Sequence, residues 1–406
     1  MKLHIKKMTA ERFFEMFLIL FWTKDIIFSY VRAIILRIPY IKYTADYILP
    51  VLMIVCLAFA SPYLVKSFAK RDIIFLFSVG IVYWLHMMLF KENESLGQIA
   101  GTFWTMVFPL YFIGLRLESQ KHWRLLYTLS IINIWVFAVY SLVISDNVLI
   151  GPQSEYVSYM GRAYILLPQL LVALAGMLKQ RNIINIISSF LGFFLLLMMG
   201  NRGSVLLTMF FVLAYVVFVL EKKKRFRIEV IIVASCAVLY LYFEKIILGL
   251  IYLSTKIGFS SRTLLRLLEG SFFQSSGRNK IIDQLKVAIW EKPLVGHGLT
   301  ADRTIAGLYA HNFAFELWTA FGIFVGSILL CTTVYLIAKA WLKSTEKKEK
   351  SILLLLICIG FLKLFISSSF LLEGAFFLLL GVCVSQIRRA KSISEISKED
   401  SINENL

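Results

Sequence analysis

Residues 46–90 read DYILPVLMIVCLAFASPYLV, KSFAKR and DIIFLFSVGIVYWLHMMLF, which are two long apolar runs joined by a short basic link. Each run has about 20 residues, the length at which an α-helix crosses the hydrocarbon core of a bilayer. Similar runs recur from one end of the chain to the other, separated by short polar links. The sequence therefore predicts an all-α fold, a polytopic bundle of transmembrane helices.

The composition agrees with this fold class. Hydrophobic residues make up 59% of the 406 residues and charged residues only 17%, against roughly a quarter in an ordinary soluble chain. The net charge of +18 arises mostly from Lys and Arg in the short links, where such residues set the orientation of helices in a membrane. We therefore expect membrane lipid around the chain and no nucleic acid partner.

Twelve apolar runs can be placed along the sequence. If all of them span, the basic links and both termini are cytoplasmic. Alternatively, residues 1–45 form an interfacial amphipathic helix, which leaves eleven spans and an N-terminus outside. The twelve runs are residues 13–31, 46–65, 72–90, 97–117, 125–145, 163–178, 182–199, 203–220, 229–252, 312–338, 351–369 and 371–387.

This pattern divides the chain into four segments. Transmembrane helices 1–9 occupy residues 1–252, and helices 10–12 occupy residues 312–387. Between them, residues 253–311 form an extracytoplasmic loop, longer than the roughly 15 residues above which a loop is usually functional or disordered. Residues 388–406 form an acidic, Ser-rich cytoplasmic tail, which we expect to be disordered.

The long loop contains two predicted helices. Residues 261–270, SRTLLRLLEG, are typical of a short helix capped by Ser261, with Arg262 and Arg266 four apart on one face. Residues 275–293, SSGRNKIIDQLKVAIWEKP, have the apolar spacing of an amphipathic helix that ends before a proline. We therefore expect the loop to lie as helices on the membrane surface.

A glycine turn and a His-Asn pair follow the second helix. The turn is PLVGHG, in which the two glycines give the backbone its freedom. The His-Asn pair stands where the chain re-enters the membrane, and a Glu begins the first turn inside the span. The residues of this motif are Gly296, His297, Gly298, His311, Asn312 and Glu316.

This combination resembles the O-antigen polymerase and O-antigen ligase superfamily, which has a Pro-x-x-Gly-x-Gly turn, a His-Asn pair, a following Glu and a Gly-Ile-x-x-Gly span. Asn-Arg-Gly-Ser at residues 201–204 and Gly-Arg at 161–162 and 277–278 resemble it more weakly. The likeness covers about residues 160–330. Two features depart from the family pattern: His297 lies between the glycines, and YILLPQ follows Arg162.

The resemblance implies a glycosyltransferase that moves a glycan from a polyprenyl diphosphate to a sugar hydroxyl, outside the bacterial plasma membrane. His311 would accept the proton of the hydroxyl, while Arg278 and Arg202 would stabilise the leaving diphosphate. The loop has no DxD carboxylate pair, so we expect no metal and no other cofactor. The expected substrate-binding residues are Arg162, Arg262, Arg266, Arg303, Asn312, Glu316, His297, Gly296 and Gly298.

Three functions stay open at this point. A polymerase joining lipid-linked oligosaccharide repeats of O-antigen, capsule or exopolysaccharide is favoured, because the outer loop is compact. An O-antigen ligase would use the same donor and a lipid A core sugar as acceptor. A flippase or transporter would place charges at the midplane of its spans, whereas Glu316 and Glu373 lie near outer ends. A chain-length regulator and a flippase are candidate partners.

Overall fold

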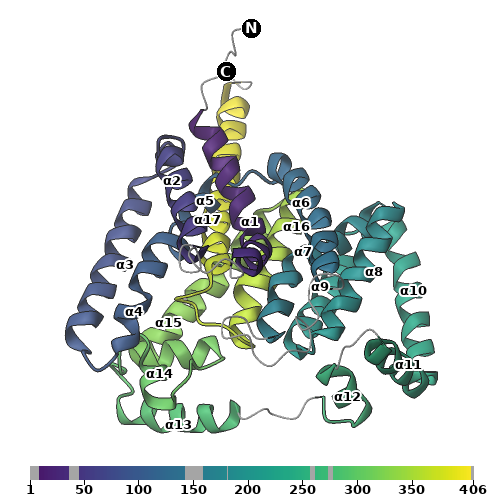
Figure 1. Cartoon of the computed structure of the whole chain (residues 1–406). Helices are drawn as coiled ribbons and strands as arrows, with labels where there is room; N and C mark the ends of the chain where they lie inside the picture. The colour runs from purple at the N-terminus through teal and green to yellow at the C-terminus, as the bar shows by residue number, and fades with distance from the viewer. Residues whose placement is uncertain are drawn as a thin grey trace. The chain divides into compact units, whose positions relative to one another are not determined.

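The computed structural model describes residues 9–35, 45–141, 159–180, 182–256, 261–272 and 278–403 (Figure 1). Every regular element in these ranges is a helix, and they contain no β-strand. This confirms the all-α class. The chain forms two compact units: unit 1 comprises Met1–Leu18, Pro50–Glu118 and Ser275–Leu406, and unit 2 comprises Ile19–Leu49 and Ser119–Gln274. The boundary near residue 275 divides the predicted loop 253–311 between the two units.

At the centre of unit 1, the C-terminal helix α17 packs against α5 and α15. Gly114 and Gly381 permit this packing, because a Cβ on Gly114 would lie 2.4 Å from the Leu378 carbonyl oxygen. Besides the start of α1 (Ala10–Ile35), the α-helices of unit 1 are α2 (Ala45–Val65, from Pro50), α3 (Lys70–Leu89), α4 (Glu94–Thr102), α5 (Leu110–Arg116), α13 (Arg278–Glu291), α14 (Ala301–Ala306), α15 (Phe313–Lys343), α16 (Lys347–Leu356) and α17 (Gly374–Asn403). Its short π- and 3-10 helices are η1 (Phe103–Val107), η3 (Ile357–Phe361) and η4 (Leu362–Phe365).

In unit 2, α7 (Tyr159–Lys179) is the central helix and contacts α6, α8 and α9. Its Gln169 amide donates to the Trp22 carbonyl at 2.9 Å, and the Trp22 indole donates to Ser130 at 2.9 Å. Trp22 belongs to α1 (Ala10–Ile35), which runs through both units. The other helices of unit 2 are α6 (Ser119–Val139), α8 (Ile183–Met198), α9 (Arg202–Phe218), α10 (Lys222–Leu241), α11 (Phe243–Lys256) and α12 (Arg262–Leu268).

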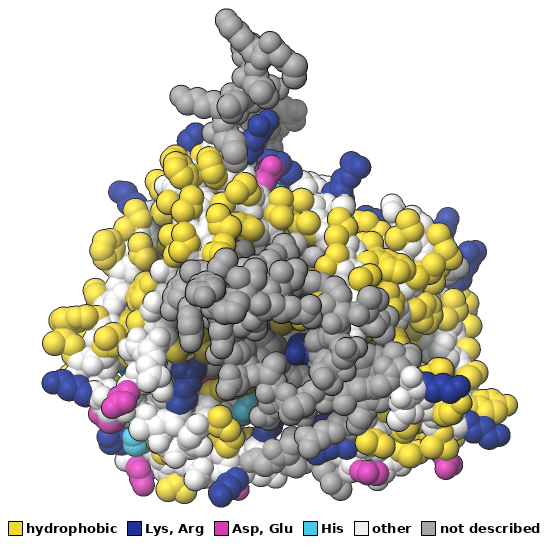
Figure 2. Space-filling model, in the orientation of Figure 1, with side chains coloured by type: hydrophobic (Ala, Val, Ile, Leu, Met, Phe, Trp, Pro, Cys, Tyr) yellow, Lys and Arg dark blue, Asp and Glu magenta, His cyan; other side chains and the backbone are white. Residues whose placement is uncertain are grey.

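Five helices in the described residues are long and apolar enough to cross a membrane: Lys70–Leu89, Glu94–Arg116, Ser119–Val139, Gly161–Lys179 and Phe313–Lys343. Apolar side chains on α3 are turned outward, including Ile74, Phe77 and Trp84 at 63%, 65% and 58% exposure. Figure 2 shows apolar side chains on the surface of the region where α2 and α3 lie. The chain is therefore a membrane-embedded helical protein; twelve spans remain a prediction.

Two predicted segments differ from the observed helices. The run 229–252 is divided, because α10 ends at Leu241, Tyr242 leaves the helical conformation and α11 starts at Phe243. The charged residues Glu244 and Lys245 follow the break and are exposed. The tail expected to be disordered instead continues α17 to Asn403, because no glycine or proline interrupts the chain after residue 381.

Candidate functional site

Helix α3 runs between an ion pair at its first turn and the glycine turn near its last residue. At its first turn, Asp72 binds Arg388 of α17. Just past its last residue, Asn93 binds the His297 carbonyl at 2.9 Å. The 20 residues of α3 span about 30 Å. The glycine turn and the basic residues around Arg388 therefore lie at opposite ends of α3, and Figure 1 shows α13 and α14 at the lower end of this helix.

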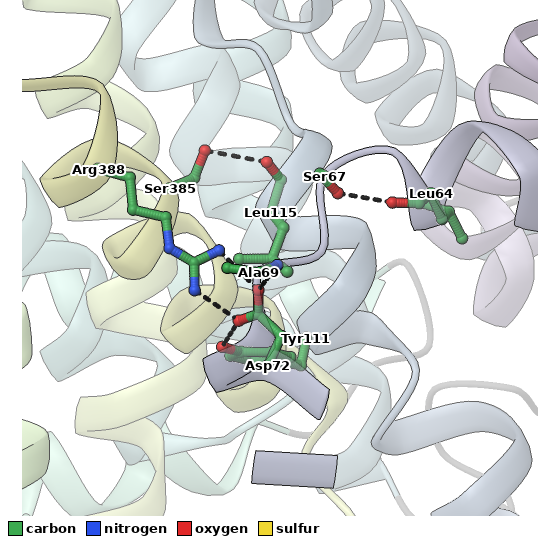
Figure 3. Close-up of polar contacts among 8 residues, drawn as sticks. All are labelled: Leu64, Ser67, Ala69, Asp72, Tyr111, Leu115, Ser385 and Arg388. Carbon is green, nitrogen blue, oxygen red and sulfur yellow. Dashed lines mark hydrogen bonds and ion pairs between the residues drawn. The ribbon is translucent and has the colours of Figure 1, made fainter. Parts of the chain in front are cut away.

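The end at Asp72 is fixed by a fully bonded carboxylate (Figure 3). Both guanidinium nitrogens of Arg388 donate to it at 2.7 Å, the Tyr111 hydroxyl donates at 2.7 Å and the Ala69 amide at 2.8 Å. Asp72 is completely buried. This bidentate pair joins α3, α5 and α17, and we call it the α17 clamp.

At the other end, the glycine turn lies against residues 319–322 of α15. Gly296 and Gly298 have φ angles of +74° and +91°, which favour glycine. A Cβ on Gly298 would lie 2.5 Å from the Phe90 ring, and one on Gly296 would lie 2.5 Å from the Gly322 nitrogen. The backbone therefore requires both glycines, and their contact with substrate stays a prediction.

Helix α15 folds back at Gly322, so the predicted span 312–338 is not one continuous helix. Gly322 has φ 78° and ψ 167°, a conformation essentially limited to glycine. A Cβ on Gly326 would lie 2.9 Å from the Leu317 carbonyl, so the segments on either side of Gly322 pack together. The Ile323 amide donates to the Pro293 carbonyl at 2.7 Å. The glycine turn thus replaces the helical bond lost at the break.

His311 is held between two backbone anchors. On one side, the Asp302 carboxylate accepts from the Ala310 amide at 2.7 Å. On the other side, the Asn312 side chain caps α15 by accepting from the Ala314 amide at 3.0 Å. The His311 ring lies against Tyr309, with ring centroids 4.0 Å apart. Its Nδ1 is shielded from solvent and has no hydrogen-bond partner among the described residues, so Nε2 is the nitrogen that can meet a ligand.

Burial and a neighbouring cation keep the His311 ring neutral. Burial and, to a smaller extent, the positive charge of Arg278 together lower the pKa of His311 to about 4. Arg278 is the first residue of α13. The structure therefore places a neutral proton acceptor beside a fixed positive charge within unit 1.

Three other predicted ligand residues in unit 1 are bonded to the protein. Asn312 caps α15, and the His297 Nε2 lies 2.7 Å from the Ala288 carbonyl, to which it must donate. Glu316 is buried and accepts from the Ser369 hydroxyl and from the Phe370 amide. These contacts give the three side chains structural roles. Their contact with substrate stays a prediction.

The two loop helices form where the sequence predicts them. In α12, the Ser261 hydroxyl accepts from the Leu264 amide at 3.4 Å and so caps the helix. In α13, the buried side chains are Leu285, Ala288 and Ile289, which lie on its predicted apolar side.

The remaining predicted arginines are divided between the units. Arg303 of α14 lies in unit 1 and interacts electrostatically with Asp302. In unit 2, Arg202 opens α9 and donates to the Phe272 carbonyl, and Arg162 of α7 is half-buried near Tyr140. Arg262 and Arg266 belong to α12, also in unit 2. The Arg262 side chain and Gly277 lie outside what the structure describes.

Sequence reasoning missed three residues that build this end of unit 1. Asp302 binds the Ala310 amide, the Asn93 amide oxygen accepts from the Thr304 hydroxyl at 3.0 Å, and His86 Nδ1 accepts from the Leu299 amide at 2.9 Å. Asn93 stands 204 residues before His297. No local pattern signals such a distant partner.

The described residues contain no group of three His, Cys, Asp or Glu side chains that could hold a metal ion. Neither a scan against protein-family models nor a search of curated proteins finds a match to this chain. Any functional conclusion must therefore come from the chemistry of the site.

Proposed function

We propose that this protein is a polysaccharide polymerase of the bacterial plasma membrane, which joins polyprenyl-diphosphate-linked oligosaccharide repeats on the outer face. The observation that carries the proposal is His311: a ring kept neutral by burial and by Arg278, at the end of unit 1 opposite the α17 clamp. The positive-inside rule assigns Lys70, Arg71 and Arg388 to the cytoplasm, and so supports an outer location for His311.

The reaction follows from these groups. The acceptor hydroxyl oxygen attacks the anomeric carbon of the donor sugar and gives its proton to His311 Nε2. As the new C–O bond forms, the bond from that carbon to the diphosphate oxygen breaks, with inversion. Arg278 stabilises the negative charge that develops on the leaving diphosphate, and a fixed guanidinium suits this because it binds phosphate oxygens in pairs. Arg202, which belongs to unit 2, stays a predicted catalytic residue.

The test is the glycan profile of a deletion strain complemented with the wild type, His311→Ala, Arg278→Ala or Arg202→Ala, each verified in the membrane. A matched control is Lys280→Ala, an exposed cation two residues from Arg278 on α13. Loss of polymer with single repeats still delivered to the surface, and a normal Lys280→Ala profile, are the expected results.

Two outcomes would contradict the proposal. Normal polymer from all three variants would show that the site is elsewhere. Long lipid-linked chains that accumulate without attachment would identify a ligase, which uses the same donor and a different acceptor.

A further inference from the structure

Asp302 is a buried carboxylate whose oxygens bind backbone amides. It lies in the first turn of α14 and is 3% exposed. One oxygen accepts from the Ala310 amide at 2.7 Å and the other from the Arg303 amide at 3.1 Å. Removing a carboxylate from water is unfavourable unless such bonds compensate. The bond to Ala310 ties the loop between α14 and α15 to the first turn of α14.

The residue after this loop has a strained backbone. His311 has φ +52°, a left-handed conformation that is unfavourable for residues other than glycine. Such strain persists where the surrounding contacts determine the conformation. Here the Asp302 bond fixes residue 310, and the Asn312 cap fixes the residue after His311.

We propose that Asp302 is a positioning residue for His311: its bond to Ala310 directs the imidazole so that Nδ1 is turned into the protein and Nε2 toward the substrate. The catalytic consequence rests on the proposed function. Asp302 itself touches neither substrate nor the transferred proton. The charged and aromatic groups that interact with His311 are Arg278 of α13 and Tyr309 of the loop, and a substitution at Asp302 removes neither side chain.

The first readout is the side-chain titration of His311, followed by NMR of the full-length protein carrying ¹³C-labelled histidine, with His311→Gln to assign the signal. We expect wild-type His311 to titrate near pH 4. Asp302→Ala should move the midpoint toward the ordinary value near 6.5, because the ring loses its buried position. Asp302→Asn should keep the wild-type midpoint, because an amide oxygen still accepts from Ala310. Asp283→Ala, at an exposed acid of α13, is the matched control.

The second readout is elongation of lipid-linked repeats. Asp302→Ala should lower kcat about 100-fold, the size expected for a misplaced catalytic group, with KM little changed, and Asp302→Asn should restore most of the rate. If Asp302→Ala does not fold, Asp302→Ser supplies the same comparison.

The inference is overturned if Asp302→Ala leaves the His311 midpoint unchanged, or if Asp302→Asn is as damaging as Asp302→Ala. If the wild type elongates nothing, the proposed function fails, whereas the titration, which needs no substrate, still decides whether Asp302 positions His311.

Discussion

At the scale of single residues, the proposed transfer reaction depends on His311 staying neutral. Burial is the larger cause of its lowered pKa and the charge of Arg278 the smaller. We expect the acid limb of the rate profile to lie near pH 4, because His311 accepts a proton only while it is unprotonated. Arg278→Ala should move this limb to higher pH while leaving it below 6.5, since burial remains. Arg278→Lys should leave it in place.

The measurement is kcat/KM for elongation by the purified protein between pH 3 and pH 8, at an enzyme concentration high enough to follow the slow residual elongation by Arg278→Ala. Lys280→Ala controls for a general loss of positive charge on α13. A limb that stays fixed in Arg278→Ala, or that moves to lower pH, would show that Arg278 does not act on His311.

The same pKa makes stability depend on pH. Because the pKa of His311 is about 4 in the folded protein and near 6.5 in the unfolded chain, the unfolded state binds more protons between these values. The free energy of unfolding should therefore fall as the pH drops from about 6.5 to about 4. Denaturation at several pH values should show a smaller decline in His311→Gln. An unchanged decline would mean that His311 is not buried as described.

At the scale of elements, the break in α15 depends on Gly322. We expect Gly322→Ala to lower the free energy of unfolding by about 1–3 kcal/mol, because alanine disfavours φ +78° and its Cβ would lie 2.5 Å from the Leu294 carbonyl oxygen. Gly101→Ala in α4 is the control, since a Cβ there meets nothing within 4 Å. Thermal unfolding in detergent compares the two. Equal effects would contradict the folded-back geometry.

The elements that could be predicted are those set by local sequence. Ser261 caps α12, and the apolar side of α13 is buried at Leu285, because cap and periodicity lie within one helix. The break at Gly322 could not be predicted from hydropathy, since the run continues unbroken through it. At the break, the Ile323 amide donates to the Pro293 carbonyl, which lies in a different segment of the chain.

At the scale of the whole molecule, the α17 clamp joins α3, in the first quarter of the chain, to the C-terminal helix α17. Asp72→Ala leaves the Arg388 charge, whose side chain is 33% exposed, without its partner, and it also removes the acceptor of the Tyr111 hydroxyl and the Ala69 amide. The free energy of unfolding should therefore fall by about 3 kcal/mol. Asp283→Ala removes an exposed ion pair, in which the Lys286 and Asp283 side chains are 56% and 67% exposed. This substitution should change the free energy of unfolding by less than about 1 kcal/mol. Chemical denaturation in detergent measures both. Equal losses would show that the clamp adds no stability.

Hydropathy alone was enough to predict a helical membrane protein, but it could not predict the division into two units. Apolar runs reveal where helices lie and not which helices pack together. Close packing of α5 with α17 depends on Gly114 and Gly381, two glycines 267 positions apart whose partnership no local pattern reveals. The motif around His311 could be recognised, but not its supports: Asp302 binds the Ala310 amide eight positions on, and Asn93 binds the His297 carbonyl 204 positions on.

The most direct measurement is elongation by the purified protein in lipid vesicles, supplied with polyprenyl-diphosphate-linked repeats and with no nucleotide sugar or other energy source. The account predicts chains of several repeats, one polyprenyl diphosphate released for each bond formed, and neither product from His311→Ala. Repeats that remain single with the wild-type protein, or equal elongation by His311→Ala, would contradict it.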